Sequence, residues 1–252
     1  EQEAVELLWR AIFSVTRMNA PDPVAAWSAH SQKNLAYRDK LNALELRSLH
    51  FTSGNGTDFT VDLADGAVWD GAMARTKSGA AFIPNVPTEE VFTAPHRERV
   101  NGVVFGTKPY VYNGDIIDGF RLVFRDGEVV EHSAEIGGEL LGRLLDSTPG
   151  ARRIGEIALV PASSPINRQG VLFYNTLFDE NAACHMALGQ SYGSCLPDSE
   201  GLSPEELEAR GMNQCAIHAD VMLGADDMAV TGIRANGEQI SIFRGGEWAL
   251  SL

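Results

Sequence analysis

The stretch CAIHADVMLG carries a histidine and an aspartate two positions apart in an otherwise apolar run. Successive side chains of a β-strand point to opposite faces, so Ile217 and Ala219 would lie on one apolar face. His218 and Asp220 would share the other face. An imidazole and a carboxylate on one face of a buried strand suit a divalent metal ion. A hydrogen-bonded His–Asp pair in the core is the alternative.

A second stretch with the pattern of a buried strand, RIGEIALVP, carries one carboxylate, Glu156. Burying an unpaired carboxylate costs several kcal/mol. Glu156 therefore needs a cation, a metal ion or an exit to solvent. An edge strand with Glu156 facing water explains the pattern equally well.

The stretch LFDENAACHMALGQSY supplies further ligand types. Asp179 or Asn181 is expected to cap a helix that runs through His185, with Glu180 at its entrance. Tyr192, seven residues after His185, would lie on the same helical face. Charge compensation of the helix N-terminus accounts for either acid, but it does not explain a histidine in an apolar helix.

Two adjacent acids, Glu89 and Glu90, stand between prolines in NVPTEEVFTAPH, and His96 follows them. In an extended segment the two carboxylates point to opposite sides, so one can enter a site and the other cannot. A solvated loop is the alternative.

Together these segments offer two histidines and at least four acids in apolar or proline-bounded surroundings. This inventory fits a site for two divalent ions that share a carboxylate bridge. The ions would also account for part of the acidic excess, which is 34 acidic against 20 basic residues and a net charge of −14.

A competing motif, Gly-Gln-Ser-Tyr-Gly, matches the G-x-S-x-G nucleophile elbow of serine hydrolases around Ser191, with Asp198 and His218 as partners. That motif follows a strand and precedes a helix. Here a helical patch is expected before it, so we interpret the match as coincidental. A structural zinc site is disfavoured because the spacing within its Cys–His pairs is unlike the usual pattern. Its members would be Cys184, His185, Cys215 and His218.

The elements that must position these residues fall into two styles. Residues 1 to about 48 predict two helices, because apolar residues such as Leu8 and Ile12 recur at helical spacing and Asp22 can cap a second helix from Pro23. From about Arg47, short alternating runs are separated by turns. The turn dipeptides predict hairpins; they are Asp126-Gly127, Asn236-Gly237 and Gly245-Gly246.

We therefore expect an α+β fold: a β-rich catalytic domain with a mixed or antiparallel sheet and a few helices, preceded by a helical segment. The division expected is a helical lead-in at residues 1–48 and a β-rich domain at residues 49–252. The few helical patches expected within the β-rich part are Glu139–Leu145, Asn181–Leu188 and Pro204–Ala209.

Composition excludes several classes of protein. The 252 residues are 44% hydrophobic and 21% charged, as in ordinary globular proteins. No apolar run approaches the roughly 18 residues of a membrane span. The acidic balance argues against nucleic-acid binding and against an anionic membrane surface. Three cysteines without a C-x-x-C motif indicate free thiols and a reducing compartment, so a cytoplasmic location is expected.

Four blocks in this order, NVPTEEVFTAPH, GEIALVP, LFDENAACH and NQCAIHADVM, resemble the thermophilic metalloaminopeptidase family, the aminopeptidase T and aminopeptidase S group. The helical beginning and the closing GEQISIFRGGEW are similar too. The resemblance implies an exopeptidase that removes N-terminal residues of peptides with two divalent ions, Zn²⁺ or Co²⁺, or else Mg²⁺ or Mn²⁺, and it implies a homodimer. Family members carry an N-terminal α/β domain that this chain, which begins at Glu1, is expected to lack.

The resemblance also implies the roles of residues. The implied metal ligands are Glu90, Glu156, Glu180, His185, His218 and Asp220. Glu156 would bridge the ions, Glu90 or Glu89 would transfer the proton, and Tyr192 would hydrogen-bond the oxyanion. The choice of Glu90 over Glu89 comes from the resemblance. A rival hypothesis is a catalytically silent protein that binds the same metals.

Overall fold

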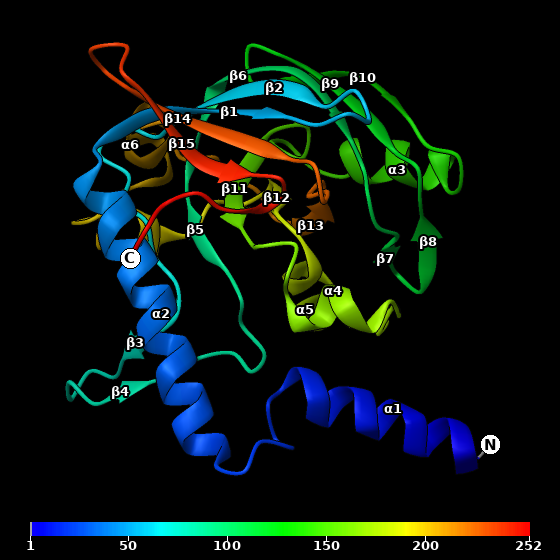
Figure 1. The fold of residues 1–252 in the computed structure, drawn as a ribbon. Coiled ribbons are helices and arrows are strands. Elements are labelled where there is room, and N and C mark those ends of the chain that lie inside the picture. The colour runs from blue at the N-terminus through cyan, green and yellow to red at the C-terminus, as the bar shows by residue number, and fades with distance from the viewer. Residues whose placement is uncertain (1) are drawn as a thin grey trace.

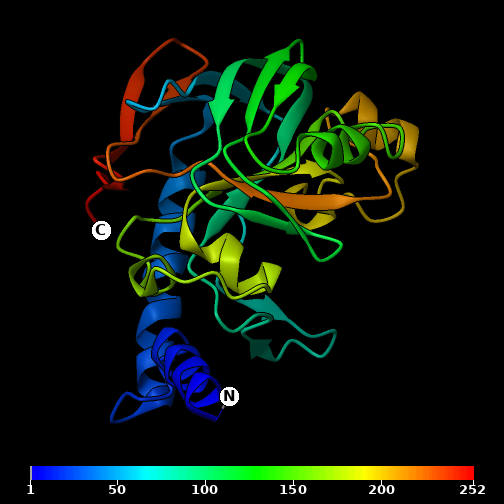
Figure 2. The ribbon, with the colours of Figure 1, turned by 90° about the vertical axis from the view of Figure 1, so that its right-hand side faces the viewer.

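The computed structural model describes residues 2–252. Two antiparallel sheets form the body of the molecule, and two helices extend from it (Figures 1 and 2). The predicted α+β class is confirmed, and every strand pair is antiparallel.

The helical beginning consists of α1 (Gln2–Val15) and α2 (Pro23–Ala43). Asp22 caps α2 as predicted, since its carboxylate accepts a hydrogen bond from the backbone N–H of Ala25. The indole of Trp27 donates to the carbonyl of Thr16, which joins the two helices. Figure 1 shows α2 running from the sheets down to the base of the molecule, with α1 extending away from the lower end of α2.

The larger sheet has eight strands in the order β10-β9-β6-β2-β1-β14-β15-β16. Their bounds are β1 (Leu46–Thr52), β2 (Asp58–Leu63), β6 (Pro95–Phe105), β9 (Arg121–Arg125), β10 (Glu128–Ser133), β14 (Ala229–Arg234), β15 (Gln239–Arg244) and β16 (Glu247–Trp248). The three hairpins predicted from turn dipeptides are all present, between β9 and β10, β14 and β15, and β15 and β16.

The smaller sheet has four strands in the order β13-β12-β11-β5. Their bounds are β5 (Val91–Thr93), β11 (Ile154–Leu159), β12 (His185–Gly189) and β13 (His218–Met222). One face packs against the larger sheet and forms the main core. The residues of that face are Ile157, Leu159, Met186, Leu188, Ala219 and Val221, all almost completely buried.

Short elements surround the two sheets. The two hairpins are β3 (Ala74–Arg75) with β4 (Ala81–Phe82) and β7 (Tyr110–Tyr112) with β8 (Asp115–Ile117). The helices are α3 (Gly138–Leu145), α4 (Pro165–Gln169), α5 (Thr176–Asp179) and α6 (Pro204–Ala209), with short 3-10 turns η1 (Glu180–Ala182) and η2 (Gly193–Cys195). The expected patches at Glu139–Leu145 and Pro204–Ala209 are helical.

The helix expected over Asn181–Leu188 is wrong. The helical conformation ends with η1, Ala183 is extended, and His185 begins β12. Asp179 does not cap a following helix, because its carboxylate accepts hydrogen bonds from the preceding backbone N–H groups of Phe173 and Asn175. The alanine, methionine and leucine residues of this segment favour a helix locally. The segment is nevertheless a strand, because β12 pairs with β11 on one side and with β13 on the other.

No helix in the part of the chain that the structure describes is long and apolar enough to cross a membrane.

Candidate functional site

The face of the smaller sheet opposite the core carries acids and histidines in register. Glu156 on β11 lies opposite Ala187 on β12, which in turn lies opposite Asp220 on β13. His185 and His218 are the first residues of their strands. The small side chain of Ala187 leaves space between the two flanking carboxylates.

Glu156 is almost fully buried and lies between the two histidines. Its Oε1 is 3.7 Å from Nε2 of His185, and its Oε2 is 3.3 Å from Nε2 of His218. The alternative in which Glu156 faces water from an edge strand is therefore wrong. One carboxylate oxygen faces each imidazole.

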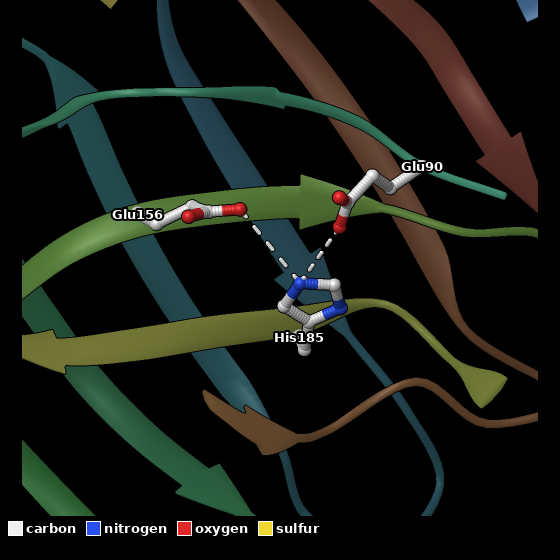
Figure 3. A group of neighbouring side chains, drawn as sticks. All are labelled: Glu90, Glu156 and His185. Carbon is white, nitrogen blue, oxygen red and sulfur yellow. Dashed lines mark ion pairs between the residues drawn. The ribbon is translucent and has the colours of Figure 1, made fainter. Parts of the chain in front are cut away.

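Each histidine belongs to a separate group of possible metal ligands. Glu90 Oε2 lies 3.1 Å from Nε2 of His185 (Figure 3), and Asp220 Oδ1 lies 3.2 Å from Nε2 of His218. The two groups are Glu90, Glu156 and His185, and Glu156, His218 and Asp220. Glu156 is the residue they share.

Both imidazoles are held in the same way. Nδ1 of His185 lies 3.1 Å from the carbonyl of Ala183, and Nδ1 of His218 lies 2.8 Å from the carbonyl of Gln190. A carbonyl only accepts, so each Nδ1 carries a hydrogen and donates it. Nε2 then faces the carboxylates, which is the arrangement of metal-binding histidines.

Glu89 and Glu90 point in opposite directions, as predicted for an extended segment. Glu90 faces His185, whereas Glu89 forms an ion pair with Arg17. Both side chains are buried, so the solvated-loop alternative is wrong.

Glu180 and Tyr192 line the same cavity, which has a volume of about 250 Å³. Glu180 lies outside both three-residue groups, although it lines the cavity together with Asp220. Tyr192 is not on a helix with His185. It follows β12 in a loop, and its ring lies 4.5 Å from the His218 ring and 5.8 Å from the Phe92 ring, centroid to centroid.

Burial and the charges of neighbouring groups shift several pKa values within the cluster. Burial raises the pKa of Glu90, and it raises the pKa of Glu180 to about 9. Burial alone would lower the pKa of each histidine, but the attraction of each imidazole to the carboxylates that face it outweighs burial. The pKa of His185 is well above its usual range, and that of His218 rises to about 10. The buried acids therefore favour the binding of cations, protons among them.

These residues fit divalent ions. None of the described residues that line the cavity is a lysine or an arginine, so protons are the only cations the cluster itself supplies. Glu90 Oε2 is buried without a well-formed hydrogen bond. Carboxylate oxygens with imidazole nitrogens suit Zn²⁺ or Co²⁺, and the carboxylates alone would suit Mg²⁺ or Mn²⁺.

Ser191 is not arranged as a nucleophile. A strand, β12, does precede it, contrary to the expected helical patch. Its buried hydroxyl, however, accepts a hydrogen bond from the backbone N–H of Asn213. His218 faces Glu156 and Asp220 instead.

Three residues near the site were not predicted to support it: Arg17, His30 and Asn181, the last of which was expected only as a possible helix cap. Arg17 and His30 come from the helical beginning and contact residues 88 and 89. Asn181 donates to Glu180 and accepts from the backbone of Glu89. Of the three, only Asn181 could have been suspected of a role at the site from the sequence, because it directly follows the candidate ligand Glu180.

Comparison with known proteins finds a family and several similar aminopeptidases. A family model described as thermophilic metalloprotease (M29) matches residues 1–248. Aminopeptidase 2 of Geobacillus stearothermophilus is 49% identical over 252 residues, which cover 100% of this chain and 61% of the relative. Aminopeptidase T of Thermus aquaticus is 47% identical over 250 residues, which cover 99% of this chain and 60% of the relative.

A solved structure is similar over almost the whole chain. Wild-type AmpT from Thermus thermophilus matches with a TM-score of 0.91 and 45% identity, covering 99% of this chain and 60% of that one. The chain thus spans about 60% of the length of the curated relatives it matches.

Proposed function

Because the chain belongs to the thermophilic metalloprotease family, we propose that it carries the catalytic centre of a metal-dependent aminopeptidase, which hydrolyses the N-terminal residue from peptides. The observation that carries the proposal is the position of Glu156. It offers one carboxylate oxygen to each of two groups that each contain a histidine. The names of the relatives supply the reaction class.

The proposed ligands are the six residues that the sequence indicated. Glu90, Glu156 and His185 would hold one ion, and Glu156, His218 and Asp220 the other. Glu180, which lines the same cavity, would complete the set. Bound divalent ions polarise a carbonyl and lower the pKa of water toward neutrality.

The chain's own residues supply the remaining chemistry. Burial raises the pKa of Glu90, so its carboxylate can accept a proton and return it to the leaving amine. Burial also raises the pKa of Tyr192, so its phenol stays protonated and can donate a hydrogen bond to a developing oxyanion. The acidic cavity would attract the cationic α-amine of a peptide, which favours cleavage at the N-terminus.

Residues 49–252 are proposed as the catalytic domain and residues 1–48 as a helical segment that supports it. The helix α2 packs on the last strand of the larger sheet, where Tyr37 stacks on Trp248 at a centroid distance of 4.0 Å. The cytoplasmic location rests on the three free thiols of Cys184, Cys195 and Cys215. The homodimer stays a prediction from the resemblance, to be checked by sedimentation.

The test is hydrolysis of a panel of aminoacyl-p-nitroanilides before and after EDTA, with Zn²⁺ or Co²⁺ added back. The proposal expects activity that EDTA abolishes and metal restores, and no cleavage of N-acetylated analogues. Activity that ignores EDTA would refute it. Metal-dependent stabilisation of the fold without turnover would instead identify a silent metal-binding relative.

A further inference from the structure

Glu89, the neighbour of the candidate ligand Glu90, is held by an arginine from the helical beginning of the chain. Arg17 donates from Nη1 to Oε1 at 2.6 Å and from Nη2 to Oε2 at 2.9 Å. The two residues are 72 positions apart. The carboxylate is 5% exposed and the arginine 20%. Such a bidentate ion pair fixes the orientation of the carboxylate as well as its position.

His30 on α2 adds a second attachment to the same segment. Its Nε2 lies 2.7 Å from the carbonyl of Thr88, which can only accept, so Nε2 is the donor. Its Nδ1 then accepts a hydrogen bond from Nη2 of Arg17 at 3.2 Å. This arrangement requires a neutral imidazole, and burial lowers the pKa of His30 accordingly.

A third attachment comes from the other side. Oδ1 of the fully buried Asn181 accepts the backbone N–H of Glu89 at 2.6 Å. The side-chain nitrogen of Asn181 donates to the carbonyl of Leu177 and to Oε1 of Glu180, at 3.0 and 3.4 Å. The backbone N–H, the side chain of Glu89 and the preceding carbonyl are therefore all held.

Consecutive side chains of an extended segment point to opposite sides. Holding the side chain of Glu89 toward Arg17 therefore directs the side chain of Glu90 toward His185 and the cavity. We propose that Arg17 and Glu89 are positioning residues that hold Glu90 in the metal-binding arrangement, so that the helical beginning of the chain completes the site. The inference rests on the proposed function. A well-packed apolar pair would stabilise the fold about as well as a buried ion pair, but it would not orient the segment.

Metal affinity of the whole chain tests the proposal. The variants are Arg17→Met, Glu89→Gln and their combination, with Co²⁺ affinity measured by chelator competition and the Co²⁺ visible spectrum as a second readout. Loss of a supporting contact typically weakens metal binding about 10–100-fold. We expect that loss for one of the two ions, with an altered spectrum, and no larger loss in the double variant.

Two further variants separate positioning from stability. Arg97→Met is the matched control, because Arg97 is 17% exposed, forms an ion pair with Glu208 and does not line the cavity. It should lower the melting temperature and leave the Co²⁺ affinity and spectrum unchanged. Arg17→Lys retains the positive charge but cannot form the bidentate pair of hydrogen bonds. It should fold, and it should recover part of the affinity that Arg17→Met loses.

The outcomes distinguish this inference from the proposed function. Wild-type Co²⁺ affinity and spectrum in Glu89→Gln and in the foldable Arg17 variants would overturn the positioning role. An equal loss in Arg97→Met would overturn it as well, because general destabilisation would then suffice. If Glu90→Gln itself bound both ions like the wild type, the proposed site would fail, whatever the Arg17 variants showed.

Discussion

Glu156→Gln perturbs the one carboxylate that both candidate metal groups share. The substitution preserves the length of the side chain but replaces a charged acceptor with an amide, one end of which donates. The wild-type oxygens lie 3.7 and 3.3 Å from the Nε2 atoms of His185 and His218. A single substitution should therefore weaken the binding of both ions, because one ion would face the amide nitrogen, which cannot coordinate, and the other a neutral oxygen in place of a charged one.

The magnitude follows from the number of ligands. A structural zinc site with four protein ligands contributes about 10–16 kcal/mol, or roughly 3 kcal/mol per ligand. Since about 1.4 kcal/mol corresponds to a tenfold change, each ion should bind on the order of 100-fold more weakly. Glu90→Gln should weaken only the ion at His185, and Asp220→Asn only the ion at His218.

The assay is competition between the protein and a chromophoric chelator, with metal content measured after dialysis. The melting temperature of each metal-free variant serves as the control for folding. If Glu156→Gln retained one ion at wild-type affinity, Glu156 would not be shared and the reasoning would be refuted.

Three further predictions follow from the site. Tyr192→Phe keeps the ring that packs beside His218 but loses the phenol, so kcat should fall about 10²-fold with unchanged metal affinity, and a wild-type kcat would contradict the assigned role. Ser191→Ala removes only an acceptor for the Asn213 backbone N–H, so it should cost about 1 kcal/mol of stability in a denaturant titration and leave activity intact; lost activity would revive the serine-hydrolase alternative. Without metal, the pKa of His218 rises to about 10 and that of Glu180 to about 9, so both groups are protonated at pH 7. Adding Zn²⁺ should therefore release about two or more protons to an indicator dye, and the Zn²⁺ affinity should rise as the pH rises toward 9. Binding of Zn²⁺ without proton release would count against these groups as ligands.

Local patterns in the sequence predicted the elements that depend on neighbouring residues. The alternation around His218 and Asp220 predicted β13 and the face that both residues share. The dipeptides Asp126-Gly127 and Asn236-Gly237 predicted their hairpins, because those turns are specified by two residues. The aspartate before Pro23 predicted the start of α2.

Features that depend on distant parts of the chain could not be predicted in this way. His185 lies in a segment of good helix formers, and only its pairing with β11 and β13 makes it a strand. The partner of Glu89 is Arg17, 72 residues earlier, and nothing near either residue indicates the other. Which of Glu89 and Glu90 enters the site is decided by that same distant contact.

The measurement that tests the central claim most directly is an activity titration of the metal-free chain. Zn²⁺ or Co²⁺ is added in steps, and hydrolysis of an aminoacyl-p-nitroanilide is followed at each ratio of metal to protein. The account predicts that activity rises to a plateau at two ions per chain. A plateau at one ion, or an activity that is full before any metal is added, would contradict it.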